Sequence, residues 1–193
     1  SRIILSSKDY SLNNDKTIND IVYKNLIGIG FNEIMTNSIC SPQANQINKD
    51  IAPIEIINPQ GVELSNLRIS LLPGMLDIIG FNINRQNKNL KLFEIGNIYF
   101  LEDENYIENK RLNIAVTGEI FKENWISKYS KNNFYYLKGV AENLLRQLNI
   151  SNIRYEINND DLFEYRLNIY SNKKIIGFIN CPVSKETLFK NKH

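Results

Sequence analysis

One continuous stretch, 56–100, constrains the fold of this chain more than any other. Its first apolar run ends at Asn58-Pro59, where the proline cannot donate to a sheet ladder and is expected to restrict its predecessor to extended geometry. A second short apolar run, 67–72, follows a polar loop. Proline then stands at position 73, in a place that the first turn of a helix tolerates. The stretch therefore opens with two candidate strands and the start of a helix.

The second half of the same stretch predicts a helix and then a strand. Apolar side chains recur at helical spacing, at Met75, Leu76, Ile79 and Ile83. A polar break leads into a new apolar run, 90–100, which we expect to be a strand. The predicted order is strand, loop, strand, helix, strand, with little chain left between the elements.

The motifs of this stretch resemble those of the β subunit of bacterial phenylalanyl-tRNA synthetase. That family has an Asn-Pro, then a Leu-Arg-x-Ser-Leu-Leu-Pro-Gly core, an Asn-x-Asn-Arg and a Phe-Glu-x-Gly. The matching residues of this chain, in the same order, are 58–59, 63–76, 82–85 and 92–96. Weaker matches flank them at 30–33 and 134–139. Each motif is weak alone, but the ordered set is specific.

The resemblance implies an α+β fold like that of a class II aminoacyl-tRNA synthetase. We expect a mainly antiparallel sheet of about six or seven strands, flanked by about three helices. Residues 1–15 would be a linker from an upstream domain, 16–185 a core module shaped like the catalytic domain but not catalytic, and 186–193 a polar tail. The chain would then be a segment of a longer subunit.

The resemblance also implies a scaffold function. The active site of the family belongs to the α subunit, in a heterotetramer that attaches phenylalanine to tRNA(Phe) with ATP and magnesium. We therefore predict no catalytic, cofactor-binding or metal-binding residue in this chain, and contact with tRNA only through the whole enzyme. The residues that we predict to form the interface with the α subunit are Ile18, Ile21, Val22, Leu26, Arg68, Pro73 and Gly74.

The alternative to a scaffold is an active class II adenylate-forming domain, in which Arg68 would bind ATP. The central stretch takes the place of class II motif 2, where an arginine of active members binds the ATP phosphate through its planar fork. The alternative for Arg68 is a polar contact to the loop or to a partner subunit. Ser70 stands where active synthetases usually keep a glutamate, and 182–186, in the place of motif 3, contains no arginine. Both departures favour the non-catalytic prediction.

Composition argues against several other classes of protein. The chain has 23 basic and 21 acidic side chains, so its net charge gives no general reason to bind a polyanion. Its only histidine is His193, which disfavours Ser-His, Cys-His and His-metal chemistry. Cys40 and Cys181 are isolated, and we interpret them as free thiols of a reducing compartment. No apolar run approaches the ~18 residues of a membrane span, so we expect a cytoplasmic protein.

Three further features leave alternatives open. Arg85, Lys88 and Lys91 could contact an RNA backbone, which would suit a stand-alone RNA-binding module. The acidic run 102–110 could hold magnesium, but it lies between two predicted strands and is better interpreted as a charged hairpin turn. Trp125 lies in a polar loop and either anchors that loop on the core or contacts a partner.

The rest of the chain predicts two more helices and several strands. One helix runs from about 15–17 to Gly28, where glycine ends it, and a second covers 134–149. A short helical turn follows Ser41. The remaining predicted strands are 33–40, 51–57, 112–117, 153–157, 163–170 and 173–179, with a tight turn at Ser171-Asn172 between the last two.

Overall fold

The computed structural model describes residues 12–48, 51–119, 133–160 and 163–182, and they form two compact units. The first unit takes in 26–119, and the second takes in 12–25 together with 133–182. The predicted tail and the loop with Trp125 lie outside the described residues, as does most of the predicted linker.

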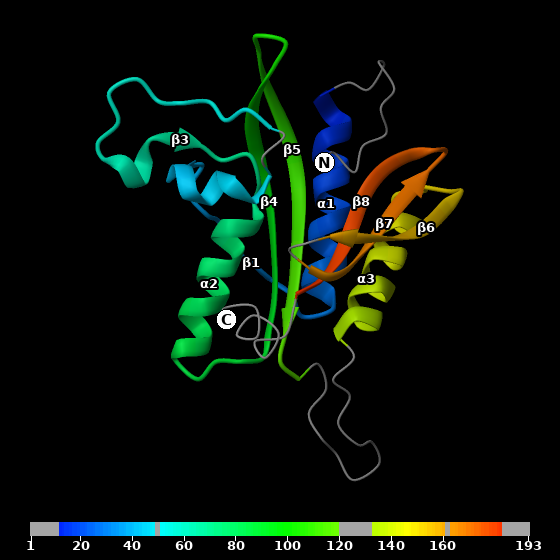
Figure 1. The fold of residues 1–193 in the computed structure, drawn as a ribbon. Coiled ribbons are helices and arrows are strands. Elements are labelled where there is room, and N and C mark those ends of the chain that lie inside the picture. Colours follow the sequence, from blue (N-terminus) through cyan, green and yellow to red (C-terminus); the bar gives the residue numbers. More distant parts are fainter. Residues whose placement is uncertain (1–11, 49–50, 120–132, 161–162, 183–193) are drawn as a thin grey trace. The chain divides into compact units, whose positions relative to one another are not determined.

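The first unit is built on a long β-hairpin (Figure 1). Strand β4, Leu90–Glu102, pairs antiparallel with β5, Asn105–Thr117, along its whole length. Asp103 and Glu104 connect them with φ angles of 48° and 63°, the left-handed geometry that matches the twist of a two-residue hairpin. The predicted strands at 90–100 and 112–117 are confirmed, but the acidic turn is much shorter than predicted because most of that run is strand.

Helix α2, Leu72–Asn84, packs on one face of this hairpin. Pro73 stands in its first turn, as the sequence predicts. Met75 of α2 meets Leu90 and Leu92 of β4 in an apolar core, around which Ile34, Ile78, Ile79 and Ala115 are partly buried. Met75 and Ile79 of the predicted apolar stripe are therefore confirmed on the packing face, which holds the helix close to the strand with the Phe-Glu-x-Gly motif, whereas Leu76 points away from it and is exposed.

Three strands predicted for the first unit are wrong in extent. The run 33–40 gives only β1, Asn32–Glu33, and β2, Ile39–Cys40. The run 67–72 gives only β3, Asn66–Leu67, because α2 already begins at Leu72. The run 51–57 makes isolated bridges, Ala52 to Leu101 and Glu55 to Asn66. The helical turn after Ser41 is confirmed as the 3-10 helix η1, Pro42–Ile47, and a second, η2, covers Val62–Leu64.

The second unit combines two helices with a meander of three strands. Helix α1, Leu12–Gly28, contributes all but its last turn, and α3 covers Asn133–Gln147. The strands are β6, Ile153–Asp160, β7, Phe163–Ser171, and β8, Lys174–Pro182, which pair antiparallel in that order. Helix α3 covers one face of the sheet, and the amide of Asn143 donates to Asn25 of α1 at 2.9 Å. All of these elements were predicted, with ends that differ by a few residues.

The strand pairing is mainly antiparallel, as predicted, but it is divided. The described strands form three sheets, β1-β4-β5, β2-β3 and β6-β7-β8, where one sheet was predicted. Strand β1 pairs parallel with β4, and every other pair is antiparallel. Among the described residues, no helix is long and apolar enough to cross a membrane.

Candidate functional site

Five residues from four separate parts of the chain meet in the first unit, and we call them the Thr36 cluster: Thr36, Arg68, Gly74, Glu94 and Gly96. Thr36 comes from the segment between β1 and β2, and Arg68 directly follows β3. Gly74 belongs to the first turn of α2, whereas Glu94 and Gly96 belong to β4. Four of the five are motif residues on which the family resemblance rests, so the motifs converge on one place.

A buried ion pair lies at the centre of the Thr36 cluster. The Nη1 atom of Arg68 is 2.8 Å from Oε1 of Glu94, and both side chains are more than nine-tenths buried. Nη1 is also 2.7 Å from the hydroxyl oxygen of Thr36, and that hydroxyl donates to the Glu94 carboxylate. The Nε of Arg68 donates to the carbonyl of Asn97 at 2.8 Å. Burying two charges is costly unless they are paired and hydrogen-bonded, and these contacts satisfy that condition.

The two glycines of the cluster leave the space that this arrangement needs. A Cβ at Gly96 would overlap Nη2 of Arg68 and lie 3.0 Å from Cδ2 of Leu71. A Cβ at Gly74 would lie 2.9 Å from both Cβ and Oγ1 of Thr36. Real side chains almost never approach so closely, so each glycine allows a neighbouring element to come into contact. The glycines of the Pro-Gly and Phe-Glu-x-Gly motifs are explained by packing.

Asn45 of η1 forms hydrogen bonds with the backbone at the end of β3 and just after it, on either side of Arg68. Its Nδ2 donates to the carbonyl of Leu67 at 3.0 Å, and its Oδ1 accepts from the backbone N–H of Ile69 at 3.2 Å. The thiol of Cys40 is 3.5 Å from the same Oδ1. Burial raises the pKa of the Cys40 thiol, against the opposing effects of the Arg68 charge and this hydrogen bond. A buried amide here replaces the ladder hydrogen bonds that a longer strand would have made.

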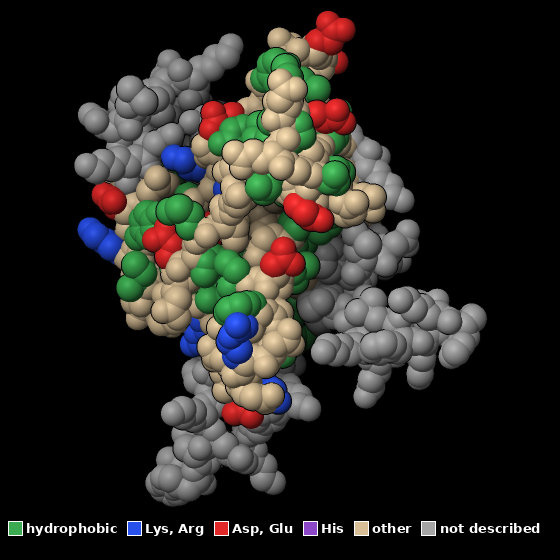
Figure 2. All heavy atoms as spheres, turned by 90° about the vertical axis from the view of Figure 1, so that its left-hand side faces the viewer, with side chains coloured by type: hydrophobic (Ala, Val, Ile, Leu, Met, Phe, Trp, Pro, Cys, Tyr) green, Lys and Arg blue, Asp and Glu red, His purple; other side chains and the backbone are tan. Residues whose placement is uncertain are grey.

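A surface pocket of about 420 Å³ adjoins the Thr36 cluster. Thr36, Arg68 and Gly74 contribute to its lining, together with residues of α2, η1 and η2. Figure 2 looks onto the side of the molecule that carries α2 and η1. Arg68 is one of the lining residues, but the hydrogen bonds of its guanidinium are directed at Thr36, Glu94 and Asn97. The arrangement is suited to holding chain segments together.

The predicted interface residues differ in how much surface they expose. Ile18 and Ile21 of α1 are partly exposed, as are Pro73 and Gly74 of α2. Val22, Leu26 and Arg68 are buried. The polar contact that we considered for Arg68 is confirmed within the chain, where Nη1 is 3.2 Å from the Thr36 carbonyl oxygen.

Of the basic residues considered for RNA contact, Arg85 and Lys88 are exposed and Lys91 is partly buried. The guanidinium of Arg85 lies 3.3 Å from the centre of the Phe81 ring and donates to the Phe81 carbonyl. Lys91 also has an interaction within the structure. Among the described residues, no group of three or more His, Cys, Asp or Glu side chains is placed to hold a metal ion.

Sequence reasoning missed Thr36, Asn45 and the pairing of Glu94. For Glu94 a signal was present: Leu90, Leu92 and Ile98 share its face of β4 and are all buried, as is Glu94 itself. A glutamate that alternates with buried apolar residues on one face of a strand requires a buried partner. Arg68 was the nearest cation in the motifs whose contact was still unknown. For Thr36 and Asn45 no comparable periodic signal exists.

The fold is that of the class II aminoacyl-tRNA synthetase core, as comparison with solved structures shows. A pyrrolysyl-tRNA synthetase from Desulfitobacterium hafniense matches with a TM-score of 0.64 and 15% identity, covering 86% of this chain and 56% of that one. An ATP phosphoribosyltransferase regulatory subunit/histidyl-tRNA synthetase from Bacillus halodurans C matches with a TM-score of 0.61 and 13% identity, covering 81% of this chain and 41% of its own. Identities this low show likeness of fold alone.

Comparison of the sequence with protein families and relatives shows the family of this chain. The family model described as the phenylalanyl tRNA synthetase beta chain CLM domain matches residues 5–180, and this chain belongs to that family. The phenylalanine–tRNA ligase beta subunit of Carboxydothermus hydrogenoformans is 32% identical over 181 residues, which are 87% of this chain and 23% of the relative. That of Syntrophus aciditrophicus is 35% identical over 148 residues, 72% and 18% respectively. The chain thus spans about a fifth of the length of these relatives.

Proposed function

We propose that this chain is the non-catalytic, synthetase-like core module of a phenylalanine–tRNA ligase β subunit, and that it packs on the catalytic α subunit. The whole enzyme, a cytoplasmic heterotetramer, would attach phenylalanine to tRNA(Phe) with ATP and magnesium bound in the α subunit. The module would supply rigid surface and no reacting group. Membership of the family and the class II fold support this proposal.

One observation carries the non-catalytic part of the proposal: Arg68 is fully engaged inside the chain. Adenylate formation depends on cations that are aimed at phosphate oxygens while the charge develops. The Arg68 guanidinium instead pairs with the Glu94 carboxylate and donates to the Asn97 carbonyl, and its side chain is buried. To reach a phosphate it would have to leave Glu94 as an unpaired buried charge, which costs several kcal/mol.

Under this proposal, the residues predicted for the interface with the α subunit have two different roles. Ile18, Ile21, Pro73 and Gly74 keep part of their surface exposed, so we propose them for contact with the α subunit. Val22, Leu26 and Arg68 are buried, and each would support the exposed interface residues of its own unit from beneath. A charge introduced at Ile21 should therefore weaken association with the α subunit, whereas a charge at Leu26 should disrupt folding first.

Titration of ATP into the assembled αβ enzyme tests the non-catalytic role. The proposal predicts one ATP for each αβ pair, and the β subunit alone should give no heat of binding. An active class II site in this module would give two ATP for each pair. Replacing Arg68 with lysine should leave the ATP stoichiometry unchanged, whereas an active site would lose one ATP, because lysine cannot reproduce bidentate phosphate binding.

A further inference from the structure

The pocket beside the Thr36 cluster has an acidic mouth. Its charged lining residues are Arg68, Glu63 of η2 and Asp77 of α2. Arg68 is neutralised by Glu94 at 2.8 Å. Glu63 and Asp77 are exposed, and neither has a hydrogen-bond or ion-pair partner among the described residues. Within the described part of the chain, the pocket therefore presents two carboxylates without a paired cation, above a floor where Arg68 is paired with Glu94.

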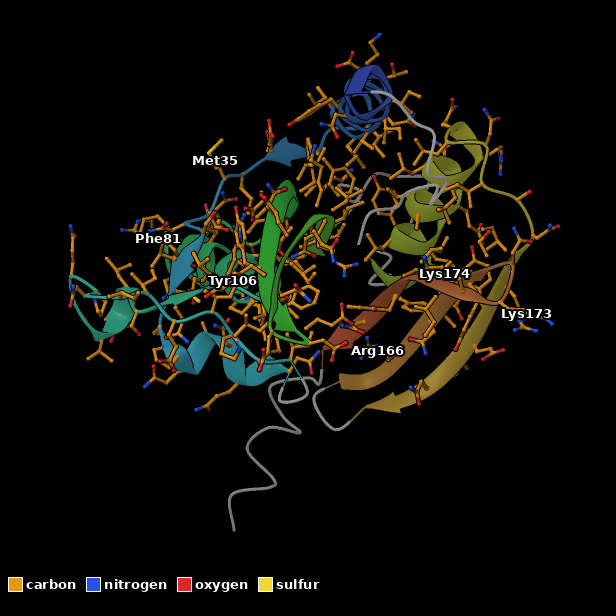
Figure 3. All side chains as sticks on the ribbon, turned by 90° about the horizontal axis from the view of Figure 1, so that it is seen from above. Met35, Phe81, Tyr106, Arg166, Lys173 and Lys174 are labelled. Atoms are coloured by element: carbon orange, nitrogen blue, oxygen red, sulfur yellow. The ribbon has the colours of Figure 1, made fainter. Side chains whose placement is uncertain are left out.

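Three exposed apolar residues are immediate chain neighbours of residues that line this pocket. Val62 is 69% exposed next to Glu63, and Leu76 is 49% exposed next to Asp77. Met35 is 90% exposed beside the lining residue Thr36, and Figure 3 shows it projecting outward. On the face shown in Figure 2, apolar and acidic side chains lie side by side. Exposed apolar groups gathered around a hollow mark a surface that another molecule covers.

The charge and the apolar rim together define the occupant. Two carboxylates repel a phosphate group, so a nucleotide or RNA backbone is the wrong ligand. They attract an ammonium or guanidinium group, and about 420 Å³ is ample for one long basic side chain with its aliphatic stem. A small soluble cation would leave Val62, Leu76 and Met35 uncovered, whereas a polypeptide segment would cover them.

We propose that this pocket is a docking socket for a segment of the α subunit that inserts one lysine or arginine between Glu63 and Asp77. Apolar residues beside that basic anchor would cover Val62, Leu76 and Met35. The inference rests on the proposed function, because it names the place on this module where the partner is held. The Thr36 cluster has a second role in this arrangement: it fixes the floor of the socket.

Double charge reversal in the full-length β subunit, assembled with its α subunit, tests the socket. The variant E63K/D77K changes two exposed side chains, so the fold should persist, and thermal unfolding checks that it does. We expect the Kd for α-subunit binding to rise at least about tenfold, because the anchor would meet two like charges. The matched control is E102K/E104K at the β4–β5 turn, which changes the net charge equally and should leave Kd within about twofold.

An apolar pair of variants checks the rim in the same assay. Leu76→Ser should raise the Kd several-fold, whereas Tyr106→Ser, on the β5 end of the hairpin turn and labelled in Figure 3, should not. Equal effects of E63K/D77K and E102K/E104K would overturn the socket while leaving the proposed function standing. If the unaltered β subunit does not bind the α subunit at all, both proposals fail.

Discussion

The two units of this chain differ in the contacts that stabilise each of them internally. In the first, short segments gather around a buried ion pair, and strands β1, β2 and β3 are two residues long each. In the second, α3 packs an apolar stripe on an antiparallel meander: Val140, Leu144 and Leu145 of α3 are buried, as is Leu148 just after it. The first unit adds specific polar partners to its apolar core, whereas the second relies chiefly on apolar area.

The difference teaches that a polar cluster can replace a ladder of backbone hydrogen bonds. Asn45 satisfies backbone groups of Leu67 and Ile69 that a longer β3 would have paired. The side chain of Glu94 accepts from the backbone N–H of Thr36 at 3.1 Å. Such a unit should be sensitive to single polar substitutions, because each one leaves a buried group unpaired.

Glu94→Ala should have the largest effect on stability. It leaves the Arg68 charge buried without its partner, at a cost of about 3–5 kcal/mol in the free energy of unfolding. Chemical denaturation measures the loss, and hydrogen exchange should place it in β4 and its neighbours. The double variant Arg68→Met with Glu94→Leu should recover most of it, because both charges are gone. A loss below about 1 kcal/mol for Glu94→Ala would show that the ion pair is not a structural centre.

Leu144→Ala is the corresponding test of the second unit. Leu144 is almost fully buried on α3, so the cavity should cost about 3 kcal/mol. Hydrogen exchange should now quicken in α3 and β7, while β4 amides keep their protection. Ser or Thr at the same position should be worse than Ala, since a hydroxyl would lack a partner there. If β4 loses protection as much as α3, the two units do not unfold separately and the comparison fails.

The same contrast explains what the sequence could and could not predict. The α3 stripe is a periodic signal and β6, β7 and β8 are apolar runs separated by polar turns, and these elements were found with small errors at their ends. The runs 33–40, 51–57 and 67–72 are apolar enough for strands, yet side-chain hydrogen bonds and the early start of α2 end them. The motifs located Arg68, Gly74 and Glu94, but only the folded chain shows that Thr36 joins them.

A pair of glycine substitutions should have smaller effects of opposite sign. Gly96→Ala would press on Arg68 and Leu71, and we expect a loss of about 1–3 kcal/mol in stability. Gly139→Ala in α3 meets nothing within 4 Å, and alanine favours a helix, so we expect a gain of about 0.5–1 kcal/mol. Thermal unfolding of both variants measures the difference. The same sign for both would contradict the view that the glycine of β4 is required for close approach.

The smallest expected effect on stability comes from the ionisation of Tyr155, a residue of β6 that contacts Glu142. Burial, and then the charge and hydrogen bond of Glu142, raise the pKa of Tyr155 to about 12. Because this value lies above the ordinary 10.0, the folded state favours the neutral phenol. Its contribution to stability is complete below pH 10 and is lost as the pH rises towards 12.

Ultraviolet titration of phenolate absorbance, compared between the native chain and Tyr155→Phe, isolates this group. Glu142→Gln should lower the pKa of Tyr155, because it removes a negative charge that opposes ionisation. Lys138 lies 3.6 Å from Glu142 and 4.6 Å from the centre of the Tyr155 ring, so Lys138→Met should raise the pKa. Neither variant should change stability at neutral pH by more than about 0.5 kcal/mol, since exposed pairs contribute little. A large loss would mean that the second unit, like the first, depends on a polar centre.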